Sequence, residues 1–238
     1  VLTWGKWQKK VLDKKKPTTP IVISGSPNFD IFQTKYRQYL LDWDLKVTKG
    51  KKDFILINTR FTLGNPKKGI THLLNTKQPL SEKLPELFLE YRYISDNKTM
   101  LNIIELCFFI AKSLPHEQII LRPHPAENIK IYQLLFKKIK NIHVICDGGP
   151  ESWVRLSRVL IHNGCTTAIQ ANISKKYVIT YIPKNLSNIE NLNTAPLPNS
   201  IGRIVHTHKD VLSNIDKKYE NLDESWKNSI SEINSIER

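Results

Sequence analysis

The sequence is poor in cysteine and has no long apolar run, and both absences exclude classes of protein. Its three cysteines, Cys107, Cys146 and Cys165, lack the CxxC spacing of a structural zinc site. Their odd number does not suit a disulfide framework. No apolar stretch approaches the ~20 residues that span a bilayer, and no signal peptide is evident. We therefore predict a cytoplasmic protein in a reducing compartment, without a structural metal.

Signatures of phosphate loops and of nucleic-acid-binding modules are absent as well. The chain contains no Walker A loop, no GxGxxG dinucleotide fingerprint and no GxSxG nucleophile elbow. It also lacks zinc-finger spacing, an RNP-like aromatic motif and a basic region followed by heptads. Yet 36 Lys and Arg face 22 Asp and Glu, a formal net charge of +14, which favours an anionic partner. Because the lysines are spread along the chain, we expect a nucleotide sugar or acidic lipid as partner, and no nucleic acid.

The first 50 residues differ in character from the rest. The chain opens on Val-Leu-Thr-Trp-Gly without an initiator Met, as we expect of a fragment or an excised domain. Residues 1–16 combine Trp4 and Trp7 with six lysines. This segment is either a solvated basic helix or an interfacial patch in peripheral contact with anionic lipid at the inner membrane. We expect residues 1–50 to be an interdomain connector and the remnant of an upstream half.

From residue 54 onward, short apolar runs alternate with helical patterns. This alternation predicts successive right-handed βαβ units and an α/β fold with a mainly parallel, Rossmann-like sheet. We expect one such domain over residues 51–210 and a polar helical tail over residues 211–238. The predicted strands are 54–58, 119–122, 142–146, 159–162 and 177–182, with an edge strand at 203–205. The predicted helices are 100–113, 127–139, 151–157 and 165–172.

Polar motifs follow three of the predicted strands. After the run ending at Leu121, the two prolines of Arg122-Pro123-His124-Pro125 hold Arg122 and His124 extended, and Glu127 opens the next helix. A rigid imidazole and guanidinium suit a phosphate or a carboxylate. The alternative is a turn with a structural histidine.

The second motif breaks the strand near 159–161 and starts a helix. Its residues are His162-Asn163-Gly164-Cys165-Thr166-Thr167, so two hydroxyls meet the free backbone N–H groups of a helix start, which favour an anion. The alternative for Thr166 and Thr167 is simple helix capping. Cys165 lacks an evident partner base and fits a small buried residue better than a nucleophile, and His162 fits a core position.

Ligands of an open parallel sheet bind outside the carboxyl ends of its strands, so the two motifs should face one pocket. The same position argument brings Asn58 and Arg60, which follow the strand 54–58, to that pocket. His206 and His208 have no third ligand at a plausible spacing, so we predict no metal site.

Four segments read together resemble bacterial surface-carbohydrate biosynthesis proteins, of capsule and lipopolysaccharide, of the glycosyltransferase type. They are residues 23–30 (Ile-Ser-Gly-Ser-Pro-Asn-Phe-Asp), 55–61 (Ile-Leu-Ile-Asn-Thr-Arg-Phe), 122–127 (Arg-Pro-His-Pro-Ala-Glu) and 162–171 (His-Asn-Gly-Cys-Thr-Thr-Ala-Ile-Gln-Ala). The resemblance implies a two-domain GT-B architecture whose carboxyl-terminal Rossmann-like half binds the nucleotide sugar. The His-Pro pair with the hydroxyl pair is also similar to the CMP-binding signature of bacterial sialyltransferases and Kdo transferases.

The resemblance implies a glycosyltransferase half that binds a CMP-activated ulosonic acid, such as Kdo or a sialic-acid-like sugar, and needs no cofactor. An upstream domain would bind a glycan or lipid-linked glycan acceptor. His124, Thr166 and Thr167 would hold the CMP phosphate. Asp30 is a further candidate catalytic group, and its alternative role is to cap the helical pattern that follows it. The remaining implied donor-binding residues are Asn58, Arg60, Arg122, Pro125, Glu127, Asn163, Gly164 and Gln170.

Two departures from the family pattern bear on the donor. This chain has Gln170 where the family usually has Glu, and an amide accepts a ribose hydrogen bond only through its oxygen. Residues 25–30 read Gly-Ser-Pro-Asn-Phe-Asp where the family usually has Gly-Asn-Pro-Arg-Phe-Asp. The alternatives are a CDP-polyol phosphotransferase or UDP-sugar enzyme of the same fold, since fold does not fix the donor, and a non-catalytic domain that binds nucleotide or anionic membrane.

Overall fold

The structure is a computed structural model that describes residues 1–15, 18–75, 88–184 and 195–219 of the 238-residue chain. Its main feature is a six-stranded sheet in which every neighbouring pair of strands is parallel. The strands are β3 (Phe54–Asn58), β4 (Ile119–Arg122), β5 (Ile142–Val144), β6 (Ser157–His162), β7 (Tyr177–Tyr181) and β8 (Arg203–Val205). The predicted α/β class with a mainly parallel sheet is confirmed.

The strand order, β5-β4-β3-β6-β7-β8, is that of the Rossmann fold. The chain builds outward from the central strand β3 in one direction, then returns to the other side of β3 with β6. Strand order therefore reverses between β3 and β6, and the crevice at such a point is where open α/β sheets bind ligands.

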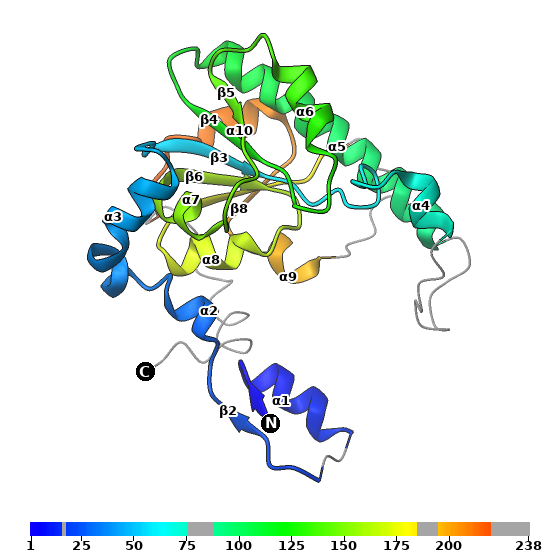
Figure 1. The fold of residues 1–238 in the computed structure, drawn as a ribbon, viewed down its shortest axis with the longest axis vertical. Coiled ribbons are helices and arrows are strands. Elements are labelled where there is room, and N and C mark those ends of the chain that lie inside the picture. The colour runs from blue at the N-terminus through cyan, green and yellow to red at the C-terminus, as the bar shows by residue number, and fades with distance from the viewer. Residues whose placement is uncertain (16–17, 76–87, 185–194, 220–238) are drawn as a thin grey trace.

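Helices cover both faces of the sheet (Figure 1). Successive side chains of a strand point to opposite faces. Ile55 and Ile57 belong to the core cluster under α5 (Phe88–Ser113), α6 (Ile129–Phe136) and α10 (His208–Asn214). Phe54 and Leu56 belong to the cluster over α2 (Pro27–Asp30), α7 (Glu151–Leu156) and α8 (Thr167–Ile173). Because both faces are covered, the strands are continuous apolar runs rather than alternating ones.

The segment from α2 to α3 (Arg37–Val47), through the 3₁₀ turn η1 (Thr34–Tyr36), packs against the sheet domain. A buried ion pair joins α3 to α7, since Asp44 accepts two hydrogen bonds from Arg155 at 2.6 and 2.7 Å. Much of the predicted connector over residues 1–50 is therefore part of this packing.

Residues 1–23 form a small unit at the other end of the molecule in Figure 1. In it β1 (Leu2–Thr3) and β2 (Val22–Ile23) pair in parallel, and α1 (Lys6–Asp13) connects them. The ring of Trp4 lies edge-on to that of Phe29, with ring centroids 5.5 Å apart, which links this unit to α2.

Some element bounds differ from the predicted ones. Helix α5 starts at Phe88, so it covers part of the weak helical pattern that follows Ser81 in the sequence as well as the stronger one predicted over residues 100–113. Strand β6 starts at Ser157 because α7 turns directly into the strand. Residues 64–80 and 185–200, which the sequence predicts to be polar loops, contain the short helices α4 (Ile70–Asn75) and α9 (Pro196–Asn199). Strand β8 lies at the sheet edge, as predicted.

The boundary predicted at residue 210 falls inside α10, whose Val211 is fully buried in the core. The rest of the predicted tail, residues 220–238, lies outside the described residues. Within the described part of the chain, no helix combines the length and the apolar character that a membrane crossing requires.

Candidate functional site

The strand ends that carry the predicted motifs lie side by side at the switch point. Asn58, the last residue of β3, is in register with Arg122 of β4 on one side and with His162 of β6 on the other. The loops that follow these three strands therefore leave the sheet at the same edge. We call the loop at 122–127 the β4 loop and the loop at 162–167 the β6 loop.

A buried carboxylate, that of Glu127, holds the β4 loop. Its Oε1 accepts hydrogen bonds from the Thr59 hydroxyl at 2.7 Å and from the His124 N–H at 3.0 Å, and its Oε2 accepts one from the Tyr132 hydroxyl at 2.6 Å. Burial raises the pKa of Glu127, whereas these hydrogen bonds and one from the Phe61 backbone lower it. Glu127 was predicted to bind the nucleotide-sugar donor, but its carboxylate accepts hydrogen bonds from groups of the protein itself.

Arg122 is also engaged within the protein. Its Nη1 and Nη2 donate to the backbone carbonyls of Asp147 and Gly148, both at 2.9 Å, and its guanidinium lies 5.4 Å from the ring centre of Trp153. Its side chain is only 6% exposed. Arg122 therefore fixes the connection between β5 and α7 and does not project from the strand end as predicted.

The side chain that the β4 loop presents to solvent is His124, together with Pro125. The Ala126 N–H donates to His124 Nδ1 at 3.2 Å. An accepting Nδ1 in the neutral ring leaves the proton on Nε2. His124 therefore carries an N–H donor on Nε2 at the exposed end of a loop that its own backbone N–H and Glu127 hold in place.

A buried neutral histidine, His162, holds the β6 loop. Its Nδ1 accepts from the Cys165 N–H at 3.2 Å, and its Nε2 lies 2.9 Å from the Thr180 hydroxyl, which itself donates to the Ile201 carbonyl at 2.6 Å. Burial, followed by the charge of Arg60, lowers the pKa of His162 to about 3. The interpretation of His162 as a core residue agrees with this placement.

The two adjacent threonines of the β6 loop have different environments. The Thr167 hydroxyl is buried, accepts from Asn58 Nδ2 at 2.9 Å and donates to the Cys165 sulfur at 3.0 Å. Thr166 is exposed, and its side chain makes no capping hydrogen bond to α8. The structure therefore presents one hydroxyl, that of Thr166, where two were predicted. Burial raises the pKa of the Cys165 thiol, which does not favour a nucleophile.

Gly164 allows the β6 loop to pass close to a cation. Its φ is +66°, and a Cβ built there would lie 2.3 Å from Arg60 Nε, so no other residue fits without a shift. The Gly164 N–H donates to Asn199 Oδ1 at 2.6 Å, and Asn163 Nδ2 donates to the Tyr181 carbonyl at 2.9 Å. Asn163 and Gly164, both predicted to bind the donor, therefore form hydrogen bonds that hold the β6 loop in place.

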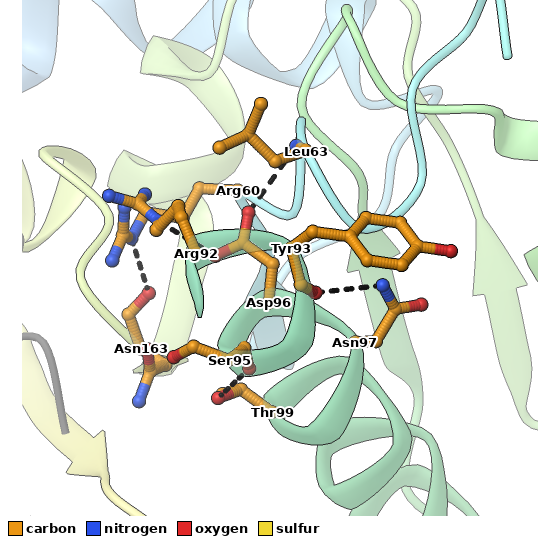
Figure 2. A network of polar contacts seen from close by, with 9 residues as sticks. All are labelled: Arg60, Leu63, Arg92, Tyr93, Ser95, Asp96, Asn97, Thr99 and Asn163. Atoms are coloured by element: carbon orange, nitrogen blue, oxygen red, sulfur yellow. Dashed lines mark hydrogen bonds and ion pairs between the residues drawn. The ribbon is translucent and has the colours of Figure 1, made fainter. Parts of the chain in front are cut away.

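A network of polar contacts around Arg60 borders the β6 loop (Figure 2). Arg60 Nε donates to the Asn163 carbonyl at 3.2 Å, and Arg92 of α5 pairs with Asp96 at 3.1 Å. The Leu63 N–H donates to the same carboxylate at 3.3 Å. Burial lowers the pKa of Arg60, and the neighbouring charge of Arg92 lowers it further. The charges of two guanidinium groups, those of Arg60 and Arg92, thus stand against the single carboxylate of Asp96, so this border of the site is positive.

Sequence reasoning did not find Arg92. It lies in a segment with only a weak helical pattern, and the available signal was its spacing of four residues from Asp96, which suits an ion pair on a helix. Two buried side-chain oxygens near the site, Asn58 Oδ1 and Gln170 Oε1, have no hydrogen-bond partner in the described part of the chain. Both belong to the predicted donor-binding set.

Asp30 is not brought to this edge of the sheet. Its carboxylate accepts from Gln33 Nε2 at 3.1 Å. Nearby, the Phe32 carbonyl accepts from the hydroxyl of Ser174, which caps the carboxyl end of α8, whereas Thr166 stands at the other end of that helix. The structure thus separates Asp30 from His124. Among the described residues, no group of three or more His, Cys, Asp or Glu side chains has an arrangement that could hold a metal ion.

Comparison with protein-family models gave no match, and comparison with curated proteins gave none either. Solved structures of similar fold exist. A variant of the wall teichoic acid polymerase TagF matches with a TM-score of 0.61 and 11% identity, over 99% of this chain and 53% of that one. A TagF structure soaked with CDPG matches with a TM-score of 0.57 and 14% identity, over 99% and 53%. The UDP-GlcNAc 2-epimerase of Neisseria meningitidis, bound to UDP-GlcNAc, matches with a TM-score of 0.52 and 13% identity, over 96% of this chain and 54% of that one.

These neighbours share the GT-B architecture, and the chain spans about half the length of each. At such low identities the likeness concerns the fold alone. The predicted Rossmann-like fold class is therefore confirmed.

Proposed function

We propose that this chain is the donor-binding half of a GT-B glycosyltransferase of surface-glycan assembly, and that its donor is a CMP-activated ulosonic acid. The observation that carries the proposal is that two exposed hydrogen-bond donors, His124 Nε2–H and the Thr166 hydroxyl, lie on the loops that follow β4 and β6, the two strands that flank β3. An upstream domain would hold the glycan or lipid-linked acceptor.

The chemistry of such a site is stabilisation of a leaving phosphate. The His124 imidazole and the Thr166 hydroxyl would donate to the phosphoryl oxygens, on which charge grows as the glycosidic bond breaks. Donors that are already in place lower the barrier because they need no reorganisation during the reaction. Arg60 and Arg92 add positive charge beside the β6 loop, where Arg92 is paired with the Asp96 carboxylate.

The nucleoside would contact Gln170, whose side-chain oxygen can accept a hydrogen bond. Gln170 is half-buried on α8, one turn from Thr166 and Thr167, and its Oε1 has no partner in the described part of the chain. We propose that this oxygen accepts a hydrogen bond from a ribose hydroxyl. An amide accepts more weakly than a carboxylate, so Gln170→Glu should tighten nucleoside binding.

A second candidate donor is a CDP-polyol. Two observations favour it: the highest of the TM-scores given above is to the wall teichoic acid polymerase TagF, and the Arg60 and Arg92 pair offers a place for a second phosphate beside the first. The likeness to UDP-GlcNAc 2-epimerase likewise keeps a UDP-sugar enzyme as an alternative.

Calorimetric titration with CMP, CDP and UDP tests these assignments. We expect tighter binding of CMP than of UDP, and we expect His124→Ala to weaken the binding of CMP. A clear preference for CDP would favour the polyol donor, and a preference for UDP would overturn the cytidine assignment. If no nucleotide gives a heat of binding, the domain is not a donor-binding one.

We also propose a peripheral contact of the α1 unit with anionic membranes. Lys6, Lys9, Lys10 and Lys14 line one shallow surface of this unit together with Asp13, which pairs with Lys9 at 3.0 Å. Leu2 and Trp4 of the same unit are exposed. Basic side chains next to exposed apolar ones are typical of interfacial segments. Cosedimentation with phosphatidylglycerol vesicles should fall when the four lysines become glutamine. Equal binding of the wild type to uncharged vesicles would contradict this contact.

A further inference from the structure

A second cluster of charged side chains lies at the opposite edge of the sheet, where β3, β6 and β7 begin. It surrounds a surface pocket of about 330 Å³ between α3, the junction of α7 with β6, and the residue before β7. This volume falls within the range of small-molecule sites. The charged residues of the lining are Arg37, Asp44, Asp53, Arg155, Arg158 and Lys176.

The two carboxylates of this pocket are held to different degrees. Asp44 makes the buried two-point ion pair with Arg155. Arg158 pairs with Glu117 at 2.9 Å and lies 3.7 Å from Asp216 and 4.0 Å from Asp53, of which only Asp53 belongs to the pocket lining. Asp53 is therefore loosely paired, and in the described part of the chain it forms no ion pair with the other two cations of the pocket.

Those two cations are Lys176 and Arg37. In the part of the chain that the structure describes, neither side chain has an ion-pair or hydrogen-bond partner. Burial, followed by the charge of Arg37, lowers the pKa of Lys176 to about 8, whereas the charge of Asp53 raises it. A second cation beside the partly buried Lys176 ammonium is unfavourable unless an anion joins the two.

We propose that this pocket is a second anion site, in which Lys176 and Arg37 bind a phosphate-class oxyanion. Asp44 neutralises Arg155 and Glu117 neutralises Arg158, so Lys176 and Arg37 remain as two cations of the lining without an ion-pair partner in the described part of the chain, which suits a doubly charged oxyanion. A guanidinium offers paired donors to such an oxyanion, and an ammonium adds a compact charge. The pocket lies at the strand starts and the donor site at the strand ends, so an anion bound here would touch neither His124 nor Thr166.

The test follows the protonation of Lys176 itself. Lysines of the whole protein are dimethylated with ¹³C-formaldehyde, and the methyl resonance of Lys176 is assigned by its loss in Lys176→Arg. Its titration midpoint is measured with and without inorganic phosphate at about 10 mM. An anion that binds the protonated lysine tenfold tighter raises this midpoint by about one pH unit, and we expect a rise of at least that size.

The neighbouring Lys175 provides a matched control, because it is exposed and does not line the pocket. Its midpoint should stay unchanged in phosphate. Arg37→Gln, a change at an exposed position of α3, should reduce the phosphate-induced rise for Lys176 at least threefold. An unchanged Lys176 midpoint, or equal rises for Lys175 and Lys176, would overturn the proposal.

The source of the phosphate group is decided in separate arms of the same experiment. Phosphatidic acid vesicles that raise the Lys176 midpoint, where phosphatidylcholine vesicles do not, identify a lipid headgroup. A rise with inorganic phosphate and none with vesicles identifies a soluble phosphate compound. If neither probe moves the midpoint, no phosphate-class ligand binds here. The donor-site titration with CMP is independent of all these outcomes.

Discussion

The β4 loop and the β6 loop are built on the same plan but anchored by side chains of opposite character. In the β4 loop the anchor is the buried carboxylate of Glu127, which only accepts hydrogen bonds. In the β6 loop it is the buried, neutral His162, which accepts on Nδ1 and faces the Thr180 hydroxyl with Nε2. Each loop presents one polar side chain to solvent at its exposed end, His124 in the first and Thr166 in the second.

The comparison shows why fewer side chains of a sequence motif are available to bind a ligand than the motif contains. A loop at a strand end must satisfy its own buried backbone and side-chain groups, and most of its polar residues do this work. Arg122 binds backbone carbonyls and Thr167 binds Asn58, so neither is available at the surface. The residues that remain exposed are the ones to test first as ligands.

The largest effect should follow from His124→Ala in the complete enzyme. If His124 donates to the leaving phosphate, loss of this donor lowers kcat by about 10²–10³ and weakens CMP binding by less. Steady-state kinetics and calorimetry measure the two effects separately. His116→Ala, at an exposed position on the amino-terminal side of β4, is the matched control and should change neither. Equal rates for His124→Ala and the wild type would make the β4 loop a structural turn.

The second effect separates the two threonines. Thr166→Val should weaken CMP binding by about 1.5–3 kcal/mol, the range for a hydrogen bond to a charged group, with no loss of stability. Thr167→Val should instead lower the free energy of unfolding by about 1 kcal/mol, because Asn58 loses a buried acceptor. Calorimetry and urea denaturation on both variants measure these quantities. The reverse pattern would show that Thr167 is the ligand.

The third effect concerns the anchor of the β4 loop. Glu127→Gln should lower the free energy of unfolding by about 1–3 kcal/mol, because an amide nitrogen then meets donors from Thr59, Tyr132 and the backbone. Urea denaturation measures this change, with Glu105→Gln at an exposed position of α5 as the control. A Glu127→Gln variant as stable as the wild type would show that the carboxylate is not the anchor.

The smallest effect is a difference in pH dependence between the anchors. The pKa of His162 is lowered from 6.5 to about 3, so the unfolded chain takes up a proton below pH 6.5 while the folded protein does not. This anchor therefore loses up to about 1.4 kcal/mol of stability per pH unit as pH falls from 6.5 toward 3. Glu127, with a raised pKa, has the opposite sign, since protonation favours the folded form.

Urea denaturation at pH 7 and pH 5.5 measures this difference. His162→Gln should show a weaker loss of stability on acidification than the wild type, and Glu127→Gln a stronger one. Parallel pH profiles for all three proteins would contradict the assignment of opposite anchors.

The fold was largely predictable from the sequence because the strands are buried on both faces. Continuous apolar runs such as Phe54 to Ile57 are conspicuous, and polar residues stop each run where the strand ends. The start of α5 was not predictable, because residues 88–99 mix charged and apolar side chains without a clear period. The direct passage from α7 into β6 was also missed, since no turn residue separates the two elements.

The candidate site was predictable in place and less so in detail. Strand ends of a parallel sheet converge, so sequence reasoning brought Asn58, Arg122 and His162 to one edge. It could not tell Thr166 from Thr167, because the difference depends on Asn58, which is distant in the sequence. Asp30 was only a candidate catalytic group in the sequence, with helix capping as the alternative, and its segment packs near Ser174, at the other end of α8 from Thr166.

The central position of β3 has a consequence for how the chain folds. Some of its contacts reach far along the sequence, since 109 residues separate Asn58 from Thr167; the ion pair that joins α3 to α7 spans 111 residues, from Asp44 to Arg155. Contacts of such long range form late, because closing large loops costs entropy before any pairing stabilises them. During synthesis β3 would pair with β4 first and keep an open edge until β6 is made. We therefore expect the donor site and the docking of α3 to appear together, in one slow step that depends on the second half of the chain.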